Sequence, residues 1–405
     1  MTNKRNYNGL FALMFIYLEF TIIVFLFKYI NVIDNMFITF IYVEINYFCL
    51  FLGYISGKNK RFHNNEIVST RKIDKLLLIL SILNIIICYY NLMHYYTSLS
   101  QVLYFFRHPG EAYSYIKHIR NNDLLITHAL DKYLGVIMNI ASNVKVIVPL
   151  LLIYYWKNSS MLSKFSSIIS IVFYIIYSFL IGAMINIGII FMFIIPTMFI
   201  RLYRSNNKKL KTYITVISLI TITLIIYFLG DRNYYVGDDK MMSGVVGIVD
   251  YLTQGYYGLS LSLKVNSNSF TGFQSIFRGL STVLSPIFGI ENKFSLSLLY
   301  RTEMEYGWPA LQKWSTIFPW LASDISFLPI PFIFFVIGYL FRVVWKNCLF
   351  ENYNVSSLMV LGILSILIFM IPANNQIFHT FSNAILTIFV IVQFIITKKT
   401  TRKNC

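Results

Sequence analysis

Charge is scarce in this chain, because only 13% of its residues are Asp, Glu, Lys or Arg, while 57% are hydrophobic. Soluble domains are about one-quarter charged, so this composition argues against a soluble enzyme. Cysteine is equally sparse, with 4 in 405 residues. Cys49 and Cys88 fall inside apolar runs, and Cys348 and Cys405 lie beside basic segments. We therefore predict neither a disulfide framework nor a cysteine metal site.

Long apolar runs occupy most of the sequence. Each is long enough to cross a hydrocarbon layer about 30 Å thick, and backbone groups in lipid must bond internally, which favours helices. The pattern predicts an all-α, polytopic transmembrane bundle, forming a single integral membrane domain over residues 1–405, with about ten spans. We place the spans at 9–27, 33–55, 76–96, 134–156, 165–181, 186–200, 212–229, 326–345, 356–372 and 381–397.

The net charge of +17 raises the question of nucleic acid binding. Most of the basic residues, however, lie in short segments before the first predicted span and after every second one, which places them on one side of the membrane. Such a distribution follows the positive-inside rule, so we predict a multi-pass protein of the cytoplasmic membrane with both termini in the cytoplasm and no nucleic acid partner. The basic segments are 4–5, 58–75, 157–164, 201–211, 342–346 and 398–403.

Two segments on the opposite side are too long to be turns. They cover residues 97–133 and 230–325, and long loops of this kind usually carry function. Within the second, residues 245–263 are apolar but interrupted by Gly255 and Gly258. This stretch is predicted to lie in the interface as an amphipathic helix or to re-enter the membrane, and a further pair of spans there would make twelve.

Three charged residues fall near the centres of predicted spans: Glu19, Glu44 and Lys145. An unpaired charge there costs about 2.5–3.5 kcal/mol on insertion scales, so each should face a partner or the bundle interior. One reading is an ion or proton path. The other is a structural pair between Lys145 and one of the glutamates, which the lack of further titratable groups favours.

The loop over 230–325 combines cations with flat aromatic rings. Guanidinium groups bind phosphate oxygens through paired N–H donors, and aromatic faces can cover the apolar side of a sugar ring. These residues predict a site for a charged sugar ligand, the alternative being an aromatic belt with solvated cations. The candidate diphosphate ligands are Arg232, Arg278 and Arg301, and the candidate sugar contacts are Trp308, Trp314, Trp320, Tyr256 and Tyr257.

Two residues are candidates for a catalytic base. Asp324 precedes a predicted span, where a carboxylate could accept a hydroxyl proton or cap the helix. His379 lies in the predicted hairpin 373–381, and its ordinary pKa near 6.5 suits proton transfer, although a lone histidine there is often only a polar surface residue. Asp238 and Asp239 lack the further oxygen ligands that a metal site requires, so we predict no metal and no cofactor.

The stretches Tyr251–Leu259 and Phe318–Asp324 resemble the oligosaccharide repeat-unit polymerases of the O-antigen (Wzy) type. The resemblance implies a GT-C-like, metal-independent glycosyltransferase of the bacterial inner membrane. It would transfer a chain from undecaprenyl diphosphate to another lipid-linked repeat unit on the periplasmic face, building O-antigen or capsule-type polysaccharide, and would have membrane lipid and a chain-length regulator protein as partners.

The resemblance also bears on the site residues. Related ligases use outer-face arginines for the diphosphate and a late histidine, and Arg232 and His379 are the positional matches here. Many relatives carry a Gly-x-Arg motif between the fifth and sixth spans, whereas this chain has Gly182-Ala183-Met184. One phosphate ligand implied by the resemblance is therefore missing, and the loop arginines Arg232, Arg278 and Arg301 are expected to bind the diphosphate instead. The alternative functions are an O-antigen ligase acting on lipid A core and a lipid-linked oligosaccharide flippase.

Overall fold

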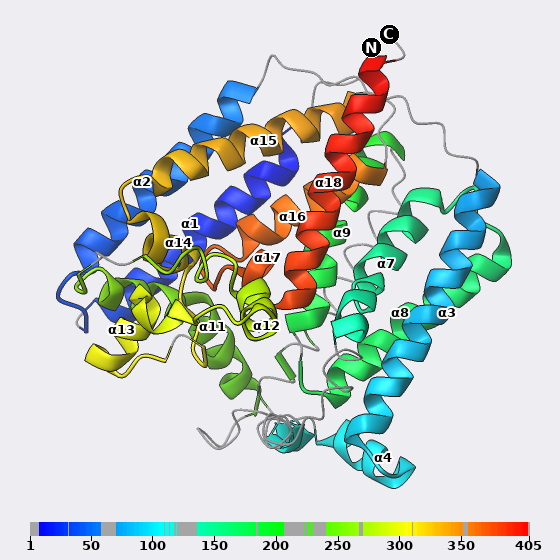
Figure 1. The fold of residues 1–405 in the computed structure, drawn as a ribbon, viewed down its shortest axis with the longest axis horizontal. Helices are drawn as coiled ribbons and strands as arrows, with labels where there is room; N and C mark the ends of the chain where they lie inside the picture. The colour runs from blue at the N-terminus through cyan, green and yellow to red at the C-terminus, as the bar shows by residue number, and fades with distance from the viewer. Residues whose placement is uncertain are drawn as a thin grey trace. The chain divides into compact units, whose positions relative to one another are not determined.

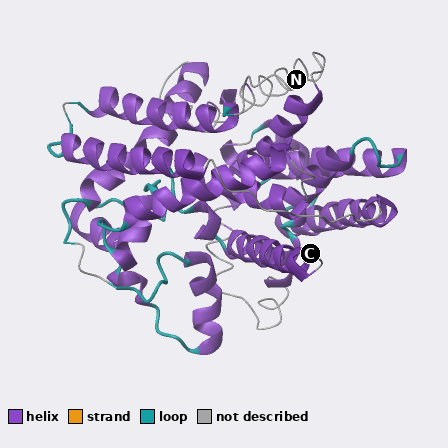
Figure 2. Cartoon of the chain, turned by 90° about the horizontal axis from the view of Figure 1, so that it is seen from above, coloured by secondary structure: helices purple, strands orange, loops and turns teal. Residues whose placement is uncertain are grey.

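The computed structural model describes residues 8–30, 32–57, 70–108, 110–112, 114–116, 119, 136–183, 185–205, 223, 226–227, 230, 240–266, 270–309, 311–350 and 355–403. Throughout these residues the regular structure is helical, without a strand (Figure 2). An all-helical fold is expected of a chain whose backbone must bond internally in lipid. The class of fold predicted from composition is therefore confirmed.

Figure 1 shows the described helices in the order in which they follow one another along the chain. Half of them have 20 residues or more, and four of the shorter ones follow one another between residues 278 and 325. They are α1 (Gly9–Tyr29), α2 (Met36–Ser56), α3 (Thr70–Tyr95), α4 (Leu99–Arg107), α7 (Val144–Tyr155), α8 (Met161–Leu180), α9 (Ile185–Ser205), α11 (Lys240–Ser262), α12 (Arg278–Phe288), η3 (Lys293–Leu296), α13 (Leu298–Tyr306), α14 (Ile317–Ile325), α15 (Ile330–Phe350), α16 (Val355–Phe369), α17 (Gln376–His379) and α18 (Phe381–Lys403).

Seven helices among the described residues are long and apolar enough to cross a membrane. They are α1, α2, α3, a helix from Val136 to Tyr155 that includes α7, α8, α9 and α15. Two shorter apolar helices, Val355–Phe369 and Phe381–Ile396, coincide with two more predicted spans. The remaining predicted span, 212–229, lies almost entirely outside the described residues. The protein is thus a helical membrane bundle, as its apolar runs predicted.

The chain divides into two compact units. One contains residues 1–65 and 249–405, and the other contains residues 66–248. All the described candidate site residues belong to the first unit, including both candidate bases.

In the first unit, α2 and α15 pack so closely that their backbones are nearly in contact (Figure 1). A Cβ added at Gly53 would lie 1.9 Å from the carbonyl oxygen of Phe335, and one at Gly338 would lie 2.0 Å from that of Leu50. Both distances are far too short for a real side chain. Small residues at helix contacts are typical of membrane bundles, where close packing replaces the hydrophobic effect as the driving force.

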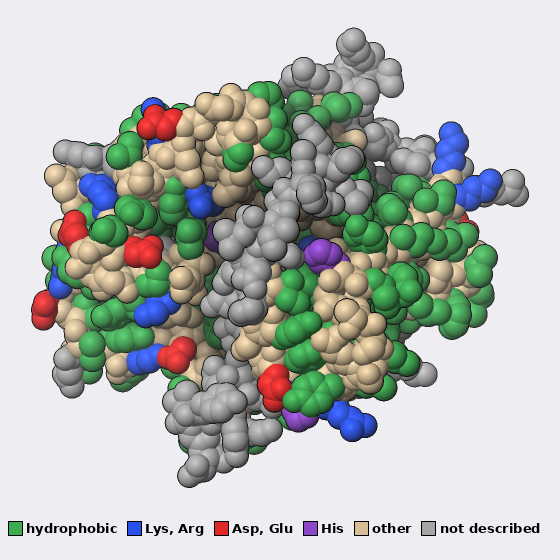
Figure 3. Space-filling view, turned by 60° about the horizontal axis from the view of Figure 1, so that its bottom comes forward, with side chains coloured by type: hydrophobic (Ala, Val, Ile, Leu, Met, Phe, Trp, Pro, Cys, Tyr) green, Lys and Arg blue, Asp and Glu red, His purple; other side chains and the backbone are tan. Residues whose placement is uncertain are grey.

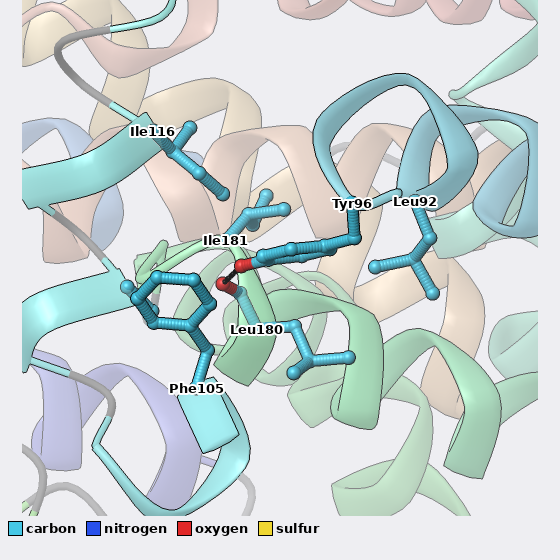
Figure 4. Close-up of a cluster of buried hydrophobic side chains, with 7 residues drawn as sticks. Leu92, Tyr96, Phe105, Ile116, Leu180 and Ile181 are labelled. Carbon is cyan, nitrogen blue, oxygen red and sulfur yellow. Dashed lines mark hydrogen bonds between the residues drawn. The ribbon is translucent and has the colours of Figure 1, made fainter. Parts of the chain in front are cut away.

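The second unit joins α3 to α8 through small polar side chains. The Ser81 and Ser167 hydroxyls lie 2.9 Å apart, and the Asn84 amide donates to the Ser170 hydroxyl at 2.9 Å. At the end of this helix pair, Tyr96 donates a hydrogen bond to the Leu180 carbonyl and packs against Phe105 of α4, which closes an apolar cluster over the helix ends (Figure 4).

The charges predicted inside the spans lie in different units. Glu19 of α1 and Glu44 of α2 are within hydrogen-bonding reach of each other. The Lys145 ammonium lies 5.8 Å from the centroid of the Tyr174 ring and interacts electrostatically with Cys88. A pair between Lys145 and a glutamate would join the two units and stays a prediction.

Apolar side chains cover much of the face seen in Figure 3, with charged side chains scattered among them. Large exposed hydrophobic residues are also numerous along the candidate spans, such as Phe27 at 80% and Phe37 at 72% exposure. A soluble protein rarely exposes so much contiguous apolar surface, whereas a bilayer covers it.

Candidate functional site

α11 lies across the end of the α1–α2 hairpin. Near its middle, Asp250 pairs with Lys28 in the last turn of α1. Further along, the Asn35 amide just before α2 donates to the Ser260 carbonyl at 2.6 Å. Because both contacts are made where α1 ends and α2 begins, α11 covers the hairpin end, and it is not among the helices suited to cross the membrane. The interfacial reading of residues 245–263 fits these contacts better than an added pair of spans.

Tyr256 projects from α11 between α1 and α2. Its hydroxyl lies 2.8 Å from the Thr21 hydroxyl and 2.6 Å from the Tyr47 hydroxyl, and the residue is 0% exposed. The aromatic ring therefore has no face open to a ligand, and its polar edge is fully used within the bundle. The structure places Tyr256 in the packing core, where no ligand can contact it.

Asp324 organises the loop that precedes α12. Its Oδ1 accepts hydrogen bonds from the Thr271 amide at 2.9 Å, the Thr271 hydroxyl at 2.6 Å and the Phe273 amide at 3.0 Å. Oδ2 accepts a longer one from the Ile276 amide at 3.3 Å. A buried carboxylate with these donors is a strong structural anchor. Asp324 lies at the end of α14, so it does not cap the start of α15 as one reading of the sequence expected.

A second set of hydrogen bonds fixes α17 against the same loop. The Asn375 amide donates to the Ile276 carbonyl at 2.8 Å, directly before Phe277 and α12. The Asn383 amide in turn donates to the Gln376 carbonyl at 2.9 Å, tying the start of α17 to α18. His379, the last residue of α17, is thereby held beside the first turn of α12.

Four side chains come together at this point. The His379 ring lies edge-on to the Trp320 ring with centroids 5.3 Å apart. Trp320 packs on Phe294 at 6.2 Å, and the guanidinium carbon of Arg278 lies 3.9 Å from the Phe294 centroid. We call Arg278, Phe294, Trp320 and His379 the His379 cluster. It unites a predicted base, a predicted phosphate ligand and a predicted sugar contact that are up to about a hundred residues apart in sequence.

The electrostatics of the cluster follow from burial and like charge. Burial lowers the pKa of His379 to about 4, and the nearby positive charge of Arg278 contributes to the shift. Burial also lowers the pKa of Arg278 below its ordinary value. His379 is therefore a neutral imidazole near pH 7, able to accept a proton, while arginine stays charged.

Several polar atoms of this region are shielded from solvent without a hydrogen-bond partner. They include Nδ1 of His379, Nε1 of Trp320, and Nε and Nη2 of Arg301 on α13. Within the described part of the chain, neither Arg278 nor Arg301 has a carboxylate partner. Buried donors without acceptors are costly, so unpaired guanidinium groups of this kind suit an anionic ligand.

The other predicted sugar contacts form a separate aromatic group. Trp308 packs against Tyr257 with centroids 4.8 Å apart and donates from Nε1 to the Trp314 carbonyl at 3.3 Å. The Lys313 ammonium lies 4.3 Å from the Trp308 centroid. Trp308, Trp314 and Tyr257 are each half-buried, so part of this surface is open to a ligand. Trp320, by contrast, is 0% exposed.

Two residues that assemble the cluster were not predicted from the sequence. The Phe294 ring packs against the Arg278 guanidinium, and the Asn375 amide fixes the position of α17. A single phenylalanine has no distinguishing signal, whereas the paired amides at Asn374 and Asn375 before a predicted span were a usable one. Arg232, the arginine given most weight from sequence, lies outside the described residues.

No family model, no curated protein and no solved structure matches this chain.

Proposed function

We propose that this protein is a membrane glycosyltransferase that polymerises oligosaccharide repeat units carried on undecaprenyl diphosphate, at the periplasmic face of a bacterial inner membrane. The observation that carries the proposal is the His379 cluster at the end of a membrane bundle. In it a neutral imidazole and an indole meet a guanidinium that has no carboxylate partner among the described residues. The unpaired nitrogens of Arg301 add a second anion-binding group nearby in sequence.

The reaction needs two kinds of assistance. An acceptor sugar hydroxyl attacks the anomeric carbon of the donor sugar, and the bond from that carbon to the diphosphate oxygen breaks, so the diphosphate leaves with the electron pair. Arg278 and Arg301 stabilise the negative charge that develops on it, without a metal. An imidazole nitrogen of His379 takes the hydroxyl proton.

Asp324 acts in this scheme as a positioning residue. Both of its carboxylate oxygens already accept hydrogen bonds from the loop 271–276. Of the two candidate bases, His379 is the one with an unpartnered nitrogen, so we assign the proton transfer to it.

The aromatic group around Trp308 is assigned to the growing sugar chain. Its half-buried rings offer apolar faces, and Lys313 adds a positive charge beside them. Flat rings of this kind suit the apolar face of a sugar.

The test uses the full-length protein in proteoliposomes with a defined lipid-linked repeat unit. The wild type should give a ladder of products. Arg278→Ala and Arg301→Ala should each lower turnover about 10- to 100-fold, which corresponds to about 1.5–3 kcal/mol for a lost charged hydrogen bond. Lys264→Ala is the matched control, because it removes a cation that pairs with the exposed Asp34 at 3.4 Å. An unchanged ladder in both arginine variants would show the assignment to be wrong.

A transporter of lipid-linked oligosaccharide is the second candidate, because Glu19 and Glu44 meet inside candidate spans. The intermediate that accumulates in a deletion strain distinguishes a polymerase, a transporter and a ligase. Loss of a polymerase leaves single repeat units on the outer face, and loss of a ligase leaves long chains on the lipid carrier. Loss of a flippase traps repeat units on the cytoplasmic face.

A further inference from the structure

We propose that the segment from Phe270 to Ile290 carries an apolar surface that inserts into the lipid leaflet at the loop end of the spans. Its large hydrophobic side chains are exposed: Phe270 at 58%, Phe273 at 47%, Ile287 at 54%, Phe288 at 69% and Ile290 at 55%. We call these five residues the apolar tip. The proposal concerns membrane contact and does not depend on the enzymatic activity proposed above.

The tip begins at a strained turn. Gly272 has φ +66° and Phe273 has φ +63°, and the Gln274 amide donates to the Thr271 carbonyl at 3.4 Å across the turn. The left-handed region suits glycine, whereas a phenylalanine there costs about 1–3 kcal/mol. The hydrogen bond from the Phe273 amide to Asp324 helps to offset this strain. The fold thus holds an aromatic side chain outward in a conformation that it would not adopt alone.

Gln274 joins this turn to the far end of the tip. Its side-chain amide donates to the Glu291 carbonyl at 2.7 Å, and its side-chain oxygen accepts from the Lys293 amide at 2.8 Å. The Ile290 amide donates to the Ser285 carbonyl at 2.9 Å, which folds Ile290 back onto the end of α12. The turn, the end of α12 and the following residues therefore form one continuous region.

This region is fixed at two places where helices enter the membrane. Asp324 holds the turn shortly before α15, a candidate span. Leu328, just before α15, is 89% exposed, and Phe332 in its first turn is 70% exposed, so the entry to this span is apolar. At the other side, a Cβ on Gly279 of α12 would lie 2.2 Å from the Thr380 carbonyl carbon, directly before α18 (Figure 1). The tip is therefore anchored beside two entries into the bilayer.

Lipid is the occupant that these positions favour. The exposed faces of α15 and α18 are apolar, and a bilayer that covers them extends to the tip that packs on their ends. Exposed Phe and Ile side chains are the residues that interfacial segments bury among acyl chains. The exposed Lys293, held beside the turn by Gln274, supplies a cation at the level of anionic headgroups.

Photo-crosslinking tests the proposal. Benzoylphenylalanine replaces Phe270 or Phe288 in the full-length protein, reconstituted in vesicles of phosphatidylethanolamine and phosphatidylglycerol. Met304 is the matched control, because it is 68% exposed on α13 but stands between Glu303 and Glu305. We expect phospholipid adducts at positions 270 and 288 at least about fivefold above those at position 304.

Two outcomes would overturn the proposal: lipid adducts at both tip positions no more frequent than at position 304, or adducts mainly to a second copy of the protein. A nitroxide at position 288 provides an independent readout. It should collide more often with oxygen than with a polar nickel complex, and the reverse should hold at position 304. Because both side chains are exposed, these substitutions leave the packed core intact.

Discussion

At the residue scale, His379 decides how the site would respond to pH. It sits edge-on to Trp320, half-buried beside Arg278, and burial with that positive charge lowers its pKa to about 4. The neutral form, which can accept a proton, is therefore present throughout the range above pH 4 in the unliganded protein. A histidine with an ordinary pKa would be half protonated near pH 6.5.

This shift predicts a wide active pH range. The value of kcat/KM for the lipid-linked repeat unit should stay nearly constant from pH 7 down to about pH 5 and fall only near pH 4, since kcat/KM reports the free enzyme. His379→Gln should lower kcat by about 10²- to 10⁴-fold, the usual contribution of a positioned base. An acid limb near pH 6.5 in the wild type would contradict the shifted pKa.

Asp324 was a candidate base because it carries a carboxylate, but its hydrogen bonds give it a structural role. Asp324→Asn keeps one acceptor oxygen but loses the charge, and its amide nitrogen cannot accept from the Ile276 amide. We expect hydrogen exchange over residues 271–276 to accelerate about 10- to 100-fold, from a loss of about 1.5–3 kcal/mol.

The control for Asp324→Asn is Glu291→Gln, which removes an exposed carboxylate from the segment between α12 and η3. It should leave exchange unchanged. Loss of turnover in Asp324→Asn with normal exchange over 271–276 would instead identify Asp324 as the base.

At the element scale, the contact between α2 and α15 depends on glycine. Gly338→Ala would place a Cβ 2.0 Å from the Leu50 carbonyl oxygen, so the helices must separate. Overpacking of this kind costs about 1–3 kcal/mol, and we expect a lower thermal midpoint in detergent. Gly188→Ala on α9 is the control, since its Cβ would meet nothing closer than Met192 Cε at 4.0 Å. Equal shifts in the two variants would refute the close packing.

The apolar stretch at 245–263, which forms part of α11, was ambiguous from its sequence. A helix that lies on a hairpin end and a helix that enters the bilayer both need an apolar face. The contacts of Asp250 with the end of α1 and of Ser260 with the start of α2 distinguish the two arrangements. They hold two parts of α11 against the same end of the α1–α2 hairpin, as expected of a helix that lies on that end.

At the scale of the whole molecule, the distribution of basic residues predicts the topology. In a background free of other accessible cysteines, Cys405 should be protected from a membrane-impermeant thiol reagent in intact cells, while Tyr306→Cys on α13 should react. Permeabilised cells should label both, which controls for burial. Reaction of Cys405 in intact cells would reverse the predicted orientation.

The sequence by itself determined the class of fold and the position of most spans. Lipid requires about 20 apolar residues for each crossing, and that requirement is local, so it can be read from a run of neighbouring residues. Sequence also indicated the loop in which His379's aromatic and cationic neighbours would be found.

The tertiary structure alone decided which of those residues meet. Arg278, Trp320 and His379 converge only because Asp324 and Asn375 hold the loop before α12 from two sides. The adjacent tyrosines differ for the same reason, since Tyr256 points between α1 and α2 while Tyr257 packs on Trp308. Such contacts join residues that are far apart in the chain, and no local pattern specifies them.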